Sequence, residues 1–239
     1  MEKLQHISRQ YGRQLEAVRR KVLKMGGLVE SQLAGAVECM VTGDAERARH
    51  IANQDYQINA LEVEIDEDCT RILATRQPAA SDLRLVMAVI KTITDLERIG
   101  DEAERIARMA KFMGGDVFRE TTMSEFDHMG QLVRQMLGEV LDAFARTDVD
   151  QAVKVVKADE KVDLKYESLI RQLMTYMVED PRCIPVILNI QWAARSLERI
   201  GDRSQNIAEY IIYLVQGKNV RHTSLESVLA GQPGDSNWP

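Results

Sequence analysis

The phrase Leu96-Glu97-Arg98-Ile99-Gly100-Asp101 occurs again 101 residues later as Leu197-Glu198-Arg199-Ile200-Gly201-Asp202. Six identical residues in a row rarely recur by chance. The flanking pair Ile106-Ala107 also returns, as Ile207-Ala208, at the same spacing. The chain therefore contains an internal duplication, which is typical of proteins built from two similar structural units.

Both copies of the phrase lie in segments with helical periodicity. Apolar or small residues recur at alternating intervals of three and four, the spacing of one face of an α-helix. They are Val86, Val89, Ile93, Leu96, Gly100, Ala103, Ala107 and Ala110 in the first copy, and Val186, Ile190, Ala193, Leu197, Gly201, Ser204, Ala208, Ile211 and Val215 in the second. A glycine inside a helix costs about 1 kcal/mol relative to alanine. We therefore expect Gly100 and Gly201 to let a neighbouring helix approach closely.

Similar break signals divide each half into three long helices. Thr42-Gly43-Asp44 ends one helix and caps the next, and Gln77-Pro78 ends the second, because the residue before proline avoids the helical region. Thr147-Asp148 and Asp180-Pro181 play the same parts in the second half. We predict an all-α protein of two tandem three-helix bundles, with six long helices. The first repeat spans 1–115 and the second 116–217, followed by a mobile tail, 218–239, rich in Gly, Pro, Ser and Asn.

The composition narrows the class of protein. Of 239 residues, 45% are hydrophobic but only 5% aromatic, and prolines number five, which suits long helices. The net charge is −6, with basic and acidic residues interleaved, so nucleic-acid binding is disfavoured. No apolar run approaches the length of a membrane-spanning helix or a signal peptide. Three isolated cysteines lack the spacing of a zinc or redox site. We expect a cytoplasmic chain with reduced thiols.

Each phrase places two carboxylates on one helical face. Glu97 and Asp101 are four residues apart, as are Glu198 and Asp202, and like charges at this spacing repel. The helical projection also puts Glu97 and Glu198 beside the apolar face. Acids beside an interior need a counter-charge, hydrogen-bond donors, a metal or a proton.

The middle helices of the two halves add further acids. Asp55 aligns with Asp159 at an offset of 104 residues. Asp163 stands four residues after Asp159, whereas Asn59 occupies that place in the first half. The first half therefore carries one carboxylate fewer in this alignment, and we expect it to hold a multivalent cation less tightly.

The spacing of the acids leaves two interpretations open. An all-oxygen set suits a hard cation such as Mg²⁺, Mn²⁺ or iron rather than a Cys/His zinc site. The alternative is a network of ion pairs at helical spacing. Its members would be Asp101 with Arg105, Glu104 with Arg108, and Arg195 with Glu198.

From about Gln5 to Gly217, the sequence resembles the PhoU family of phosphate-uptake regulators. The resemblance is carried by Met25-Gly26-Gly27, Arg76-Gln77-Pro78, Ser81-Asp82-Leu83-Arg84, both Glu-Arg-Ile-Gly-Asp phrases and Arg171-Gln172-Leu173-Met174-Thr175-Tyr176. It implies two three-helix bundles and metal clusters held by Glu/Asp-x-x-x-Asp motifs. The matching metal-ligand candidates are Glu97, Asp101, Asp159, Asp163, Glu198 and Asp202, together with Asp55. Asn59 departs from the pattern.

The resemblance also implies a function. A family member would be a non-enzymatic cytoplasmic protein, expected here as a homodimer, that represses the phosphate-starvation response. It would link the ATPase subunit of a phosphate ABC transporter to a sensor histidine kinase, and would reach the membrane only through these partners.

Two other classes of function stay open at this stage. One is a carboxylate-bridged metalloenzyme, and the other is a metal-free helical scaffold. Against an enzyme, no Glu-x-x-His pair of the di-iron type accompanies the acids, and no Walker phosphate loop or nucleophile elbow occurs.

Overall fold

The computed structural model describes residues 2–78, 80–113 and 120–217, and these are almost entirely helical. The α-helices are α1 (Glu2–Thr42), α2 (Ala45–Ala52), α3 (Tyr56–Arg76), α4 (Ala80–Ala110), α5 (Glu120–Arg146), α6 (Val149–Glu179) and α7 (Ile184–Gln216). A short 3₁₀ helix, η1 (Pro181–Cys183), precedes α7. No strand occurs among the described residues. The prediction of an all-α protein is confirmed.

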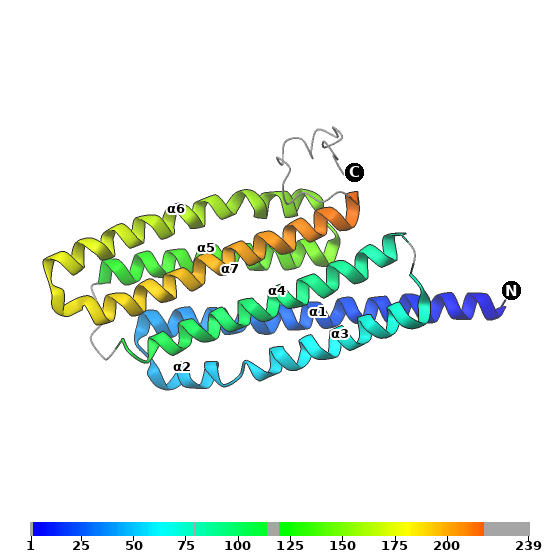
Figure 1. Ribbon diagram of the computed structural model, residues 1–239, viewed down its shortest axis with the longest axis horizontal. Coiled ribbons are helices and arrows are strands. Elements are labelled where there is room, and N and C mark those ends of the chain that lie inside the picture. The colour runs from blue at the N-terminus through cyan, green and yellow to red at the C-terminus, as the bar shows by residue number, and fades with distance from the viewer. Residues whose placement is uncertain (1, 79, 114–119, 218–239) are drawn as a thin grey trace, which may run out of the picture.

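The helices form an elongated bundle in two similar sets (Figure 1). Helices α1 to α4 make one set and α5 to α7 the other. The sets join where α4 packs against α7 and α1 packs against α5. In each of these pairs the chains run in opposite directions (Figure 1). The predicted tandem arrangement is therefore confirmed, with the two sets facing each other across α4 and α7.

Reciprocal glycine contacts show how the two repeats are related. An added Cβ at Gly26 would lie 2.4 Å from the Leu141 side chain, and one at Gly130 would lie 2.7 Å from Val37. Gly26 and Gly130 are equivalent at an offset of 104 residues, as are Val37 and Leu141. Each repeat thus gives the other the same contact, as a pseudo-twofold axis requires. The glycines let α1 and α5 approach closely.

The helix starts after the first helix of each repeat follow the predicted pattern. Asp44 accepts a hydrogen bond from the backbone N–H of Arg47 at 3.0 Å, and Asp148 accepts one from Gln151 at 3.0 Å. These N-caps satisfy backbone donors that the first turn leaves without partners. Gly43 before the first cap has φ +72°, a conformation that glycine adopts without steric cost.

One predicted helix is interrupted. The sequence pattern predicts a single helix from about Asp44 to Thr75, but residues 53–55 form a turn between α2 and α3. The equivalent stretch of α6 is continuous. Asn53 and Gln54 stand where α6 has Lys157 and Ala158, and alanine and lysine favour the helix more than asparagine does.

The buried side chains of both repeats form one continuous core rather than two separate ones. Cys39 and Cys69 are buried free thiols and Cys183 is half-buried. The third helix, predicted to end near Gly114, ends at Ala110. The predicted boundary at 115 and 116 and the tail 218–239 lie outside the described residues.

Candidate functional site

The two phrases lie in the middle of α4 and α7, and a carboxylate from the neighbouring helix faces the glycine of each. An added Cβ at Gly100 would lie 3.2 Å from Asp55 Oδ1, and one at Gly201 would lie 2.9 Å from Asp159 Oδ1. Both glycines are buried. The predicted close helix approach is confirmed at both positions, and the group that uses the space is an aspartate.

The second repeat brings Asp159, Asp163, Glu198 and Asp202 into one electrostatic cluster. The pKa of Asp159 is raised to about 7, first by burial and then by the charges of Asp202, Asp163 and Glu198. The pKa of Asp202 is also raised, first by burial and then by Asp163. This cluster resists full ionisation, so a cation or a proton would stabilise it.

Within this cluster, Glu198 forms an ion pair with an arginine. Arg195 donates to Glu198 Oε1 at 2.7 Å, and the Arg195 guanidinium also lies over the ring of Tyr166, 5.7 Å from its centroid. Glu198 Oε2 is buried and has no hydrogen-bond partner in the described part of the chain. A buried acceptor without a partner is costly and indicates a missing donor or ion.

In the first repeat, Asp55, Glu97 and Asp101 lie together as the alignment predicted. Burial raises the pKa of Glu97, and Asp101 and other acids raise it further. Burial likewise raises the pKa of Asp101, followed by the charge of Asp55. Asp55 differs from Asp159 because it accepts hydrogen bonds, from Gln32 Nε2 at 3.1 Å and from Asn59 Nδ2 at 3.0 Å.

Glu62 is a member of the first cluster that the sequence alignment missed. Its pKa is raised by burial, then by Asp66 and, to a smaller extent, by Asp101, against the opposing effect of Arg98. Glu62 therefore adds a carboxylate where the alignment has Asn59 in place of Asp163, and the weaker cation binding expected for the first repeat stays a prediction. Glu62 follows Asp55 by seven residues, two helical turns, and this spacing was the available signal. The repeat alignment hid it because Tyr166 occupies the equivalent position.

The predicted ion pairs form in part. Arg108 pairs with Glu104 at 2.5 Å, and Arg195 with Glu198 at 2.7 Å. Arg105 pairs with Glu102 at 3.1 Å rather than with the predicted Asp101. Asp101 therefore stays with the carboxylates of its cluster.

The donor chemistry of the second cluster fits a hard cation, because it offers only carboxylate oxygens and includes the orphaned Glu198 Oε2. Within the described residues, however, no three His, Cys, Asp or Glu side chains are placed so as to hold a metal ion between them. Cation binding would therefore require some of these carboxylates to rotate. The first cluster fits less well, because both oxygens of Asp55 already accept hydrogen bonds.

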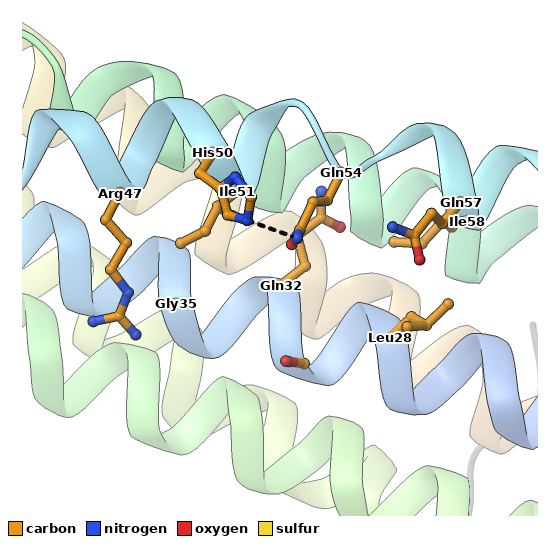
Figure 2. A pocket seen from close by; sticks show the side chains of 10 residues that line it. Leu28, Gln32, Gly35, Arg47, His50, Ile51, Gln54, Gln57 and Ile58 are labelled. Atoms are coloured by element: carbon orange, nitrogen blue, oxygen red, sulfur yellow. Dashed lines mark hydrogen bonds between the residues drawn. The ribbon is translucent and has the colours of Figure 1, made fainter.

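A pocket of about 240 Å³ lies between α1 and the junction of α2 with α3 (Figure 2). Its lining mixes aliphatic and polar side chains, and the His50 and Gln54 side chains in it are hydrogen-bonded at 2.9 Å. Arg47 lies at one end and pairs with Glu38 at 2.7 Å. Gln32 belongs both to this pocket and to the first cluster, through its bond to Asp55.

Comparison with known proteins decides the family. A family model described as the PhoU domain matches residues 22–110 and again residues 126–211. The chain belongs to the PhoU family. The two matches correspond to the two sets of helices and to the two phrases.

Several relatives within the family are similar over nearly their whole length. The phosphate-specific transport system accessory protein PhoU of Escherichia coli (strain K12) is 48% identical over 233 residues, 96% of each chain. The PhoU homolog of Pseudomonas aeruginosa is 51% identical over 220 residues, 92% of this chain and 91% of that protein.

Solved structures agree with this assignment. The crystal structure of PhoU from Pseudomonas aeruginosa superposes with a TM-score of 0.84 at 50% identity, covering 87% of this chain and all of that one. The phosphate transport system regulatory protein PhoU from Streptococcus pneumoniae gives a TM-score of 0.81 at 29% identity, covering 88% and 99%. Among the described residues, none of the helices has the length and apolar character needed to cross a lipid bilayer.

Proposed function

We propose that this chain is a non-enzymatic regulator of phosphate uptake that keeps the phosphate-starvation response off when phosphate is plentiful. The observation that carries the proposal is the match to a phosphate-specific transport system accessory protein at 48% identity over 96% of both chains. A second relative at 29% identity is described as a phosphate transport system regulatory protein. An accessory or regulatory role in phosphate transport therefore supports a regulator rather than a catalyst.

The proposed mechanism is contact with two partners. The chain would act in the cytoplasm as a homodimer, bind the ATPase subunit of the phosphate ABC transporter, and transmit the transporter's state to a sensor histidine kinase. It would lie at the membrane only through these partners. Its continuous core supports such a role, because a single packed unit can present two surfaces at once.

We also propose that the acidic clusters bind a hard cation, Mg²⁺, Mn²⁺ or iron. The candidate ligands are the predicted acids of α4, α6 and α7, together with Asp55 at the N-cap of α3. The buried Glu198 Oε2 without a partner and the raised pKa of Asp159 support this for the second repeat. A bound cation would neutralise the like charges and hold α6 against α7.

The metalloenzyme alternative takes second place. A hydrolase would need an open metal position and a base beside it. Around the two clusters, the described residues place carboxylates, guanidinium groups and amides. A turnover screen on phosphoesters would detect such an activity directly.

Deleting the gene tests the regulatory proposal. We expect phosphate-starvation genes to be switched on in phosphate-rich medium, because the kinase loses its restraint, and expression from a plasmid should silence them again. Pull-downs with the intact chain at high and low phosphate should recover the transporter ATPase and the kinase. If the deletion strain keeps these genes silent in high phosphate, the proposal is wrong and the metalloenzyme becomes the leading alternative.

A further inference from the structure

The pocket between α1 and the junction of α2 with α3 has a buried floor and an exposed polar rim (Figure 2). The floor is formed by the buried residues Gln32, Gly35, Ile51 and Ile58. The rim is formed by the exposed residues Ser31, Arg47, His50, Gln54 and Gln57. Apolar side chains with a few polar groups beside them are the usual lining of a small-molecule site. The volume of about 240 Å³ suits a molecule smaller than a typical drug.

A glycine and a break between two helices shape this pocket. An added Cβ at Gly35 would lie 2.6 Å from Ile51 Cδ1, so α2 packs closely against α1 at this point. Residues 53–55 form the turn between α2 and α3. Gln54 lies in this turn, and Gln57 lies in the first turn of α3. The break therefore places two amide side chains at the edge of the pocket.

The second repeat has neither the glycine nor the break. At the offset of 104 residues, Glu139 stands in place of Gly35, and α6 is continuous where the first repeat has its turn. Glu139 accepts a hydrogen bond at 2.8 Å from Gln135, which is the equivalent of Ser31. An acid thus stands at the position that the first repeat leaves without a side chain. The pocket is therefore a feature of the first repeat and not a consequence of the shared bundle.

The charge of the pocket favours an anion. None of the described residues that line it is acidic, although the chain as a whole has a net charge of −6. Arg47 places a guanidinium at one end, opposite the end where Gln57 lies (Figure 2). A guanidinium forms two parallel hydrogen bonds with a carboxylate or a phosphate.

The ion pair with Glu38 shows that Arg47 can bind an anionic group in this way. Arg47 contacts both carboxylate oxygens of Glu38, at 2.7 and 2.8 Å. Glu38 does not line the pocket, and the two side chains are 48% and 54% exposed. Exposed pairs of this kind contribute little to stability. The anionic group of a ligand can therefore replace Glu38 at small cost.

The rim also offers groups for the rest of a ligand. In the described part of the chain, the Ser31 hydroxyl and the Gln57 side-chain amide form no hydrogen bond with another residue. His50 and Gln54 are hydrogen-bonded to each other at 2.9 Å. Hydroxyl and amide groups both donate and accept hydrogen bonds, so Ser31 and Gln57 suit a hydroxylated molecule.

We propose that this pocket binds a small organic anion with a hydroxylated body. The carboxylate or phosphate of the ligand pairs with Arg47 in place of Glu38. Its hydroxyl groups bond to Ser31 and Gln57, and its carbon skeleton lies on the aliphatic part of the floor. The site is separate from the two acidic clusters, and its test is independent of both proposals made above.

Four probes, titrated by isothermal calorimetry into the full-length chain, test the chemical class of the ligand. Ribose 5-phosphate and gluconate are hydroxylated anions with a phosphate and a carboxylate, ribose is neutral, and inorganic phosphate lacks the organic body. We expect at least one of the two organic anions to bind about 10-fold or more tightly than ribose and inorganic phosphate. The one that binds more tightly identifies the preferred anionic group. No binding of either organic anion, or equal affinity for ribose or for inorganic phosphate, would overturn the proposal.

Variants of the ion pair place the binding in the pocket. Arg47→Met should weaken binding of the organic anion about 10- to 100-fold, because a charge-assisted hydrogen-bonded pair is lost. Arg49→Met is the matched control, since Arg49 is exposed on α2 and does not line the pocket, and it should leave the affinity unchanged. Glu38→Gln should strengthen binding, because a competing carboxylate is removed. Equal losses from the two arginine variants, or weaker binding by Glu38→Gln, would contradict the proposal.

Amide hydrogen exchange gives a readout that does not depend on a variant. With the organic anion at saturation, exchange should slow in residues 45–58, which the ligand ties to α1, and should stay unchanged in the equivalent residues 149–162 of α6. Equal protection of both segments would show that the anion binds elsewhere.

Discussion

At the scale of single residues, the ionisation of Asp159 links the fold to pH. Its pKa is raised from the ordinary 3.8 of an aspartate to about 7, first by burial and then by the charges of Asp202, Asp163 and Glu198. The folded state therefore holds the proton more tightly than the unfolded state does. The stabilisation is complete below pH 3.8 and is lost as the pH rises through about 7. For so buried a group, the loss is on the order of 3 to 5 kcal/mol.

We predict that the free energy of unfolding, measured by urea denaturation without metal, falls between pH 5 and pH 8. In Asp159→Asn the fall should be smaller, because the amide cannot ionise. Glu160→Gln, an exposed neighbour on the same helix, is the matched control and should keep the wild-type slope. Parallel slopes in wild type and Asp159→Asn would show that this carboxylate does not govern the pH dependence.

At the scale of helices, the crossing of α1 and α5 depends on the absence of two side chains. Leu141 faces Gly26 with the flexible end of its side chain, whereas Val37 faces Gly130 with both methyl groups, at 2.7 and 3.1 Å from an added Cβ. Valine is branched at Cβ and has few alternative rotamers. The contact at Gly130 can therefore adjust less.

We predict that Gly130→Ala lowers the midpoint of urea unfolding, because overpacking costs about 1–3 kcal/mol while alanine returns about 1 kcal/mol of helix propensity. Gly26→Ala should cost less. Gly27→Ala is the control, since nothing lies within 4 Å of its added Cβ, and it should stabilise α1 by about 1 kcal/mol. If Gly130→Ala were as stable as Gly27→Ala, close approach would not explain the glycine.

At the scale of helices, the sequence patterns predicted some features of this fold and missed others. The three-and-four spacing predicted the packed faces of α4 and α7, and the caps at Asp44 and Asp148 marked the helix starts, because these signals are local. The repeat alignment also predicted that Asp55 and Asp159 belong to the acidic clusters. It did not show the hydrogen bond from Gln32 to Asp55, because these two residues are 23 positions apart and the bond joins α1 to the turn before α3. Nor did it find Glu62, which has no acidic counterpart in the second repeat.

At the scale of the whole molecule, reciprocal polar contacts join the two repeats between α4 and α7. Asp95, 3% exposed, accepts hydrogen bonds from Arg203 at 3.3 Å and from Tyr210 at 2.8 Å. Glu102 accepts one from Ser196 at 2.6 Å. At an offset of 101 residues, Asp95 corresponds to Ser196, and Glu102 to Arg203. The contact between Asp95 and Arg203 and the contact between Glu102 and Ser196 therefore join equivalent positions of the two repeats. In both contacts the acid lies on α4.

These contacts also lie next to the acidic phrases. Glu102 directly follows Asp101, and Arg199, which directly follows Glu198, donates to Glu102 at 3.1 Å. Asp101 and Glu198 are therefore each adjacent in sequence to a residue of the Arg199–Glu102 hydrogen bond, which joins the two repeats. This gives the two clusters a short physical connection through α4 and α7.

We predict that Arg203→Met destabilises the chain by about 1–3 kcal/mol, measured by urea unfolding, because the buried Asp95 carboxylate loses the Arg203 donor and keeps the Tyr210 hydroxyl. Arg171→Met is the matched control. Arg171 pairs with Glu167 at 3.6 Å on the exposed face of α6, and such surface pairs contribute about 0–1 kcal/mol. The double variant Asp95→Asn with Arg203→Met should recover much of the loss, since the uncompensated charge is removed. Equal small losses in Arg203→Met and Arg171→Met would mean that the contact between Arg203 and Asp95 contributes little to holding the two repeats together.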